Sequence, residues 1–137
     1  MAAKLKEYSV IYLIGSVGYS LIEILWRGFT HWSMAITGGL CFVLLHKNNL
    51  KHWSSSIWTK CARGAMIITS VEFSVGCVVN LVLKLDVWDY SKLHFNILGQ
   101  VCPLYSVLWF FLCIPLTFLT PVLHRRLRVR SLLSARR

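Results

Sequence analysis

Long apolar runs separated by short polar segments dominate the pattern of this chain. A helix that crosses the roughly 30 Å hydrocarbon core of a bilayer needs about 20 mainly apolar residues, because no backbone polar group can stay unpaired in lipid. Four stretches meet or approach this length, at residues 7–26, 30–46, 57–85 and 97–123. The pattern therefore predicts an all-α integral membrane protein, a bundle of four transmembrane helices.

Composition also favours a membrane protein over a soluble domain. Of the 137 residues, 56% are hydrophobic and only 15% are charged, whereas soluble domains usually have about 25% charged residues. The net charge of +10 would suggest a nucleic-acid partner in a soluble protein, but these charges lie between and beyond the apolar runs. We therefore expect the lipid bilayer as the partner and no nucleic acid.

The basic residues are distributed unevenly between the two sides of the predicted bundle. Twelve of the 15 Lys and Arg residues lie in the N-terminal end, the segment 47–63 and the segment 125–137, which share one side. Cytoplasmic loops carry an excess of Lys and Arg, so both termini are predicted to be cytoplasmic. Residues 1–124 then form the transmembrane domain, and residues 125–137 form a basic cytoplasmic tail that contacts anionic lipid headgroups.

The cysteines are scattered singly within or beside the apolar segments. None forms a C-x-x-C pair, and no histidine lies at a spacing typical of a metal site. Reduced cysteines commonly act as small packing residues, and we expect that role here, with no metal site, no disulfide and no cofactor. The five residues are Cys41, Cys61, Cys77, Cys102 and Cys113.

Two glutamates fall inside predicted membrane helices. A charge near the bilayer centre costs about 2.5 to 3.5 kcal/mol on insertion scales, so such residues normally face the bundle interior and have a partner. Glu23 lies four residues before Arg27, which allows an ion pair. Glu72 lies deep in the third helix, and glycines at Gly15 and Gly76 predict that the first and third helices pack together around both glutamates. The alternative is that both are hydrogen-bonded struts that fix the helix register.

Further polar residues collect at the end of the bundle away from the termini. They lie in two predicted outer loops and in the helix ends beside them. Gly99 and Pro103 at the start of the fourth helix either loosen its backbone or serve close helix packing, which is the more common role of small residues in membrane helices. Trp88 and Tyr90 also fit the aromatic belt of a membrane interface. The combination predicts a ligand-binding or pathway site that opens to the outer face. Its candidate residues are Glu23, Arg27, His31, Glu72, Asn80, Trp88, Asp89, Tyr90, Asn96 and Gln100.

Short motifs in both halves of the chain resemble a known family. The first half contains Gly18-Tyr19, Ile22-Glu23, Arg27-Gly28, residues 30–34 (THWSM) and residues 38–42 (GGLCF). The second half contains Glu72-Phe73, Gly76, Asn80, residues 87–91 (VWDYS), Asn96 and Gly99-Gln100. These motifs resemble small bacterial multi-pass membrane proteins catalogued as ABC-transporter permeases. The chain departs from them at His94, where members often have proline.

The resemblance implies a permease in a bacterial inner membrane, and the sequence limits how such a permease would be energised. The chain has no P-loop of the G-x-x-x-x-G-K-[ST] type, so energised transport requires a separate ATPase. We expect a permease-like or channel subunit that acts as a homo-oligomer or with a partner membrane subunit, because four helices form a narrow bundle. The alternative is a non-transporting sensor, assembly factor or holin-like pore former. An enzyme is not expected, because residues 15–18 (GSVG) lack the G-x-S-x-G nucleophile pattern.

Overall fold

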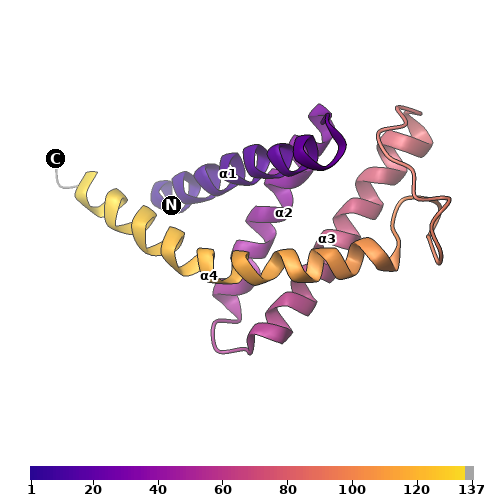
Figure 1. The fold of residues 1–137 in the computed structure, drawn as a ribbon. Coiled ribbons are helices and arrows are strands. Elements are labelled where there is room, and N and C mark those ends of the chain that lie inside the picture. The colour runs from indigo at the N-terminus through magenta and orange to yellow at the C-terminus, as the bar shows by residue number, and fades with distance from the viewer. Residues whose placement is uncertain (135–137) are drawn as a thin grey trace.

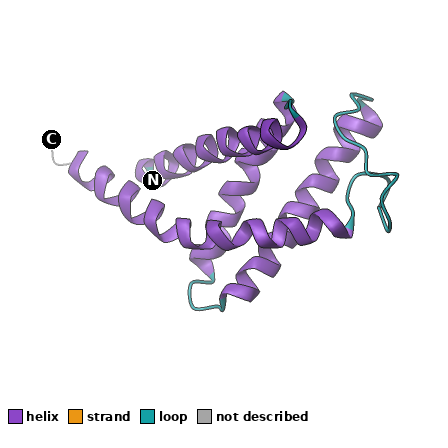
Figure 2. Cartoon of the chain, viewed as in Figure 1, coloured by secondary structure: helices purple, strands orange, loops and turns teal. Residues whose placement is uncertain are grey.

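The computed structural model describes residues 1–134, which form helices joined by loops (Figure 1, Figure 2). Within this part of the chain, the β-type pairing consists of one isolated bridge between Ile97 and Val101. The predicted all-helical fold is confirmed. Its elements are α1 (Ala2–Arg27), α2 (Trp32–Lys51), α3 (Ile57–Gly76), the π-helix η1 (Cys77–Val82) and α4 (Pro103–Ser134).

Three helical segments are long and apolar enough to cross a membrane, namely Ala2–Arg27, Ile57–Val82 and Pro103–Arg130. They correspond to the first, third and fourth predicted spans. α2 is a helix of 20 residues, but it carries polar side chains such as His46 and Asn49. Ten of its residues are buried against other parts of the protein, so these polar groups need no contact with lipid. A fourth membrane crossing by α2 and the cytoplasmic position of both termini stay predictions.

The last helix begins later than the sequence pattern indicated. Leu98 and Gly99 have positive φ values of 52° and 70°, which a right-handed helix does not allow. α4 starts instead at Pro103, and proline is favoured in the first turn of a helix because its missing N–H is not needed there. The predicted start of this helix at Ile97 is therefore wrong. The preceding helix ends at Val82, three residues before its predicted end.

α4 also continues beyond residue 123, where the membrane helix was expected to end. It extends as one helix to Ser134, although Pro115 and Pro121 lie inside it. Residues 125–134 of the predicted tail are therefore helical, and residues 135–137 lie outside the described part of the chain. The assignment of residues 125–137 to the cytoplasm stays a prediction.

The helices pack as two pairs joined through α2. α1 lies mainly against α2, α3 lies mainly against α4, and α2 also contacts α3 and α4 (Figure 1). Gly15 of α1 faces the backbone of Gly38 in α2, whereas Gly76 lies beneath Trp88 and Gln100 of the following loop. The prediction that the first and third helices pack together is therefore wrong, because their glycines approach α2 and the loop instead.

The largest hydrophobic cluster lies where α2, α3 and α4 meet. All five cysteines are free, and four of them are buried, so they fill space in the helix contacts. Ile68 belongs to this cluster and precedes Glu72 by one helical turn, so the core supports the face of α3 that carries the glutamate. The buried members are Cys41, Leu45, Cys61, Ala65, Ile68, Trp109 and Cys113.

Candidate functional site

Glu72 of α3 is a buried carboxylate, with only 4% of its surface exposed. The Tyr90 hydroxyl donates to its Oε1 atom over 3.0 Å, and the Trp109 indole N–H donates to its Oε2 atom over 2.9 Å. Both donors are neutral. Within residues 1–134, no Lys, Arg or His side chain forms an ion pair with Glu72. An ionised Glu72 would therefore carry a negative charge that no cationic side chain of this region neutralises.

A cavity of about 210 Å³ adjoins this carboxylate. All four α-helices contribute to its wall, which is apolar except for a few groups that include Glu72, Thr37 and Tyr19. Small-molecule pockets usually measure about 300 to 1,000 Å³, so this cavity suits a ligand smaller than most. Its composition, apolar walls with a few polar groups on one side, is typical of a binding site rather than of a water-filled channel.

Four aromatic rings form a row beside Glu72. The rings of Tyr90 and Tyr105 are stacked with centroids 4.4 Å apart, and Tyr105 lies 6.1 Å from Trp109. Trp109 in turn lies 6.0 Å from Tyr19, across the cavity wall. The faces of aromatic rings attract cations. The aromatic row and the carboxylate therefore both favour a positively charged ligand.

The predicted ion pair of α1 is present. Glu23 and Arg27 contact each other at 2.5 Å, and Arg27 also donates through Nη1 to the Val87 carbonyl over 2.9 Å. The charge of Glu23 is compensated by its partner, and the charge of Glu72 is not. The structure thus confirms the ion pair that the sequence allowed for Glu23, and it gives Glu72 two neutral donors instead.

Asn80, Trp88 and Gln100 hold the loop 83–102 against the end of α3. The Asn80 amide donates to Gln100 Oε1 over 2.8 Å and accepts from the Val87 backbone N–H over 2.7 Å. The Trp88 indole N–H donates to the Gln100 carbonyl over 3.0 Å. All three side chains are buried. These predicted site residues therefore position the loop, and through it Tyr90, without lining the cavity themselves.

Burial raises the pKa of the Tyr90 hydroxyl above its usual range, and the Glu72 carboxylate raises it further. The hydroxyl therefore keeps its proton and acts as a donor to Glu72. Tyr90 is the link through which a loop outside the helices reaches the buried carboxylate.

Three other predicted site residues shape turns and the end of a helix. Asp89 accepts hydrogen bonds of 2.8 Å from the backbone N–H and hydroxyl of Ser91, which lower the pKa of its carboxyl. Asn96 accepts from the Gly99 N–H over 3.0 Å. His31 caps α2 by accepting from the Ser33 N–H over 3.3 Å. None of these three residues lines the cavity beside Glu72.

The loop 83–102 has a strained backbone. Four of its non-glycine residues have φ values between 47° and 57°. Such conformations cost on the order of 1–3 kcal/mol each and cluster at ligand clamps and switch regions. The hydrogen bonds that hold the loop down must therefore overcome this strain. The four residues are Lys84, Asp86, Phe95 and Leu98.

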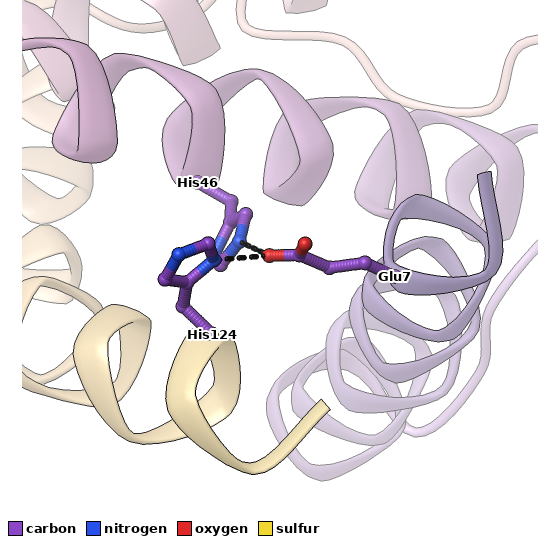
Figure 3. A group of neighbouring side chains, drawn as sticks. All are labelled: Glu7, His46 and His124. Atoms are coloured by element: carbon purple, nitrogen blue, oxygen red, sulfur yellow. Dashed lines mark hydrogen bonds and ion pairs between the residues drawn. The ribbon is translucent and has the colours of Figure 1, made fainter. Parts of the chain in front are cut away.

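A second buried polar cluster lies at the opposite end of the helices, where α1 begins and α2 and α4 approach their ends. It consists of Glu7, His46 and His124, whose side chains point toward one another (Figure 3). Their ligand-type atoms all lie within 4.8 Å of one another, so the group could hold a metal ion. No local sequence pattern indicates this cluster, and no metal site was expected from the spacing of the cysteines and histidines. The cluster follows only from the topology. Successive helices run in opposite directions, so the start of α1 and the ends of α2 and α4 lie on the same side.

The fold and the buried carboxylate define a helical membrane protein with a small, largely apolar cavity beneath a folded loop. Residues 8–134 match the family described as "Putative ABC-transporter type IV", and the chain belongs to that family. The resemblance seen in the sequence is thereby confirmed, and a transport-like membrane protein fits both findings. No curated protein and no solved structure matched the chain.

Proposed function

We propose that this protein is a permease-like or channel subunit that binds a small organic cation beside Glu72. The observation that supports this most is the buried carboxylate without a cationic side-chain partner, set in an aromatic and largely apolar cavity. A cation that enters such a site loses its hydration, and the carboxylate and ring faces replace it. An anionic ligand would instead meet repulsion from Glu72 and a weaker interaction with the ring faces.

The carboxylate retains capacity to accept a ligand. A carboxylate offers about four lone-pair positions, and Tyr90 and Trp109 occupy one on each oxygen. A ligand with an ammonium group therefore gains an ion pair without displacing either donor. The apolar walls would contact the alkyl part of the same ligand.

The proposal includes an orientation and partners. In the predicted topology both termini are cytoplasmic, so the loop 83–102 lies on the outer face and the site is reached from there. The chain has no P-loop, so a separate ATPase would supply energy. A pathway wider than this cavity would need a second copy or another membrane subunit. Under this proposal the protein performs no catalysis of its own.

Tetramethylammonium is a suitable probe, because it is a compact cation with an apolar surface. We expect saturable binding to the purified protein in lipid nanodiscs, measured by isothermal titration calorimetry. Glu72→Gln should weaken binding at least about tenfold, equivalent to about 1.4 kcal/mol. Asp86→Asn is the matched control, because it makes the same chemical change at an exposed position of the loop.

The structural alternative for Glu72 gives a different result. If Glu72 only fixes helix packing, the wild-type protein binds no probe and Glu72→Gln changes nothing but thermal stability. That outcome would refute the binding proposal. Equal loss of binding in Asp86→Asn would also refute it, because attraction would then depend on overall charge and not on the buried site.

A further inference from the structure

The cluster of Glu7, His46 and His124 brings three side chains from three helices to one point (Figure 3). His46 Nε2 lies 2.9 Å from Glu7 Oε1, and His124 Nδ1 lies 2.6 Å from the same oxygen. Both imidazole rings thus direct a nitrogen at a single carboxylate oxygen. Convergence of two nitrogens and one oxygen on one small volume is the arrangement that a bound metal ion requires.

From this geometry we propose that Glu7, His46 and His124 form a binding site for a divalent transition-metal ion of the Zn²⁺ type. Two histidines and one glutamate are a known ligand set for zinc, with bonds of about 2.0 to 2.2 Å and a fourth position left for water. Tetrahedral ligands on such bonds lie about 3.3 Å apart. The two nitrogens lie 2.9 and 2.6 Å from Glu7 Oε1, closer than this, so side-chain rotations that move the ligand atoms apart would admit the ion.

Burial of His46 keeps water away from its Nε2 atom, which favours coordination. The His46 side chain is fully buried, with 0% of its surface exposed, and its Nδ1 atom has no hydrogen-bond partner. Coordination through Nε2 would replace the hydrogen bond to Glu7 by a metal bond, and the metal bonds must also offset the cost of the buried Nδ1 that has no partner. Coordination would also fix the tautomer, because Nε2 must then be free of its proton and Nδ1 must carry it.

A metal here would join helices that otherwise touch little. α1 and α4 share few contacts, and an open groove of about 800 Å³ lies between them on the side of the cluster. His124 immediately precedes Arg125 and Arg126, which line that groove. Asn49 donates to Thr120 over 3.2 Å, one turn away from the histidines on both α2 and α4. The bound ion would therefore fix the basic end of α4 against α1 and α2.

Metal content of the purified protein tests this site directly. The protein is stripped with EDTA in detergent, titrated with Zn²⁺ against a fluorescent chelator, and loaded with Co²⁺ for visible absorption. We expect one Zn²⁺ per chain and the absorption bands of tetrahedral Co²⁺. Loss of a supporting group around a metal costs about 10- to 100-fold in affinity, so loss of a direct ligand in Glu7→Gln or His124→Gln should cost at least as much.

Two variants and one control keep the test decisive. His124 keeps 29% of its side chain exposed, so His124→Gln should fold even if replacement of the fully buried His46 disturbs the core. His94→Gln is the matched control, because His94 is exposed in the loop 83–102 at the far end of the helices. Absence of stoichiometric Zn²⁺ binding would overturn the proposal and leave a hydrogen-bonded triad. Binding that survives Glu7→Gln and His124→Gln would overturn it equally.

The metal site and the cation site are independent. Glu72→Gln should leave Zn²⁺ binding unchanged, because Glu72 lies on α3 and the metal ligands lie on α1, α2 and α4. A failure of the cation proposal therefore has no bearing on the metal proposal.

Discussion

The indole N–H of Trp109 donates to Oε2 of Glu72 over 2.9 Å, and both side chains are buried. Trp109 belongs to α4 and Glu72 to α3, so this bond joins two helices at the cavity wall. The Tyr90 hydroxyl reaches the other carboxylate oxygen from the loop 83–102. The carboxylate thus depends on two donors from separate parts of the chain, and each donor has a different effect when it is removed.

Trp109→Phe should destabilise the helix pair of α3 and α4. The substitution keeps an aromatic ring but leaves Oε2 of Glu72 without its donor in a buried position. Loss of such a bond costs about 1–3 kcal/mol in the free energy of unfolding, and hydrogen bonds within membranes fall toward the lower end of that range. Thermal unfolding of the purified protein in detergent measures this loss.

Trp58→Phe provides the comparison for Trp109→Phe. Trp58 is 63% exposed and stacks on Phe110, so its replacement by phenylalanine keeps the stacking and breaks no bond to Glu72. Its unfolding midpoint should stay close to that of the wild type. If the double variant Glu72→Gln with Trp109→Phe is less stable than the wild type by the full sum of the two single effects, the two residues are not coupled and the bond is not formed.

Tyr90→Phe should release the loop without unfolding the helices. The ring stays stacked on Tyr105, but the hydroxyl that bonds Glu72 is lost. The strained backbone of the loop then has one attachment fewer. Hydrogen exchange should become faster for the backbone amides of residues 83–102, while the amides of α1 and α2 keep their protection.

Tyr105→Phe separates the effect of the hydroxyl from that of the ring. Tyr105 belongs to the same aromatic row but donates no hydrogen bond to Glu72, whose two donors are Tyr90 and Trp109. In Tyr105→Phe, the backbone amides of residues 83–102 should exchange hydrogen at the wild-type rate. Equal acceleration in both variants would show that stacking, and not the bond to Glu72, holds the loop down.

Gly38→Ala should weaken the contact between α1 and α2, and Gly18→Ala should not. A methyl group at Gly38 would overlap the Cβ atom of Tyr19, whereas a methyl group at Gly18 meets no atom within 4 Å. Overpacking of this kind costs about 1–3 kcal/mol, and alanine at an open helical position gains up to about 1 kcal/mol over glycine. Unfolding midpoints should therefore shift in opposite directions. A matching loss in both variants would contradict the α1–α2 packing.

The helices could be predicted from the sequence because the features that indicate a helix lie within short segments of the chain. Apolar length alone identifies α1, α3 and α4, and four-residue spacing alone identifies the pair of Glu23 and Arg27. Which helices are neighbours is not a local property. Glycine in a membrane helix indicates close approach but does not name the partner, so Gly15 was assigned to the wrong helix.

The candidate site was predictable in part for the same reason. The cost of a charge in lipid indicates that Glu72 faces inward, and the structure buries it. The attachment of Tyr90 to Glu72 depends on how a 20-residue loop folds back, which neither periodicity nor spacing specifies. Glu7, His46 and His124 lie far apart in the sequence, and only the alternation of helices brings them together.

Membrane topology decides from which side the cavity beside Glu72 is reached, and single cysteines can report it. If the segment Ile57–Val82 crosses the membrane, the turn before it and the loop 83–102 lie on opposite sides. Ser54 and Lys92 are exposed in these two segments, so Ser54→Cys and Lys92→Cys are the reporters. The wild-type chain is the control, because it gives the labelling of the five native free cysteines. With an impermeant maleimide, Lys92→Cys should be labelled in intact cells and Ser54→Cys only after the cells are opened, because the basic segments are retained in the cytoplasm.

Two other labelling patterns would each contradict part of the topology. Labelling of both positions from one side would mean that α3 does not separate them, against its length and apolar content. Labelling of Ser54→Cys alone in intact cells would place the basic segments outside, and the loop above Glu72 would then face the cytoplasm. The cation site would keep its geometry in that case, but it would be loaded from the inner face, and the direction proposed for the permease would be reversed.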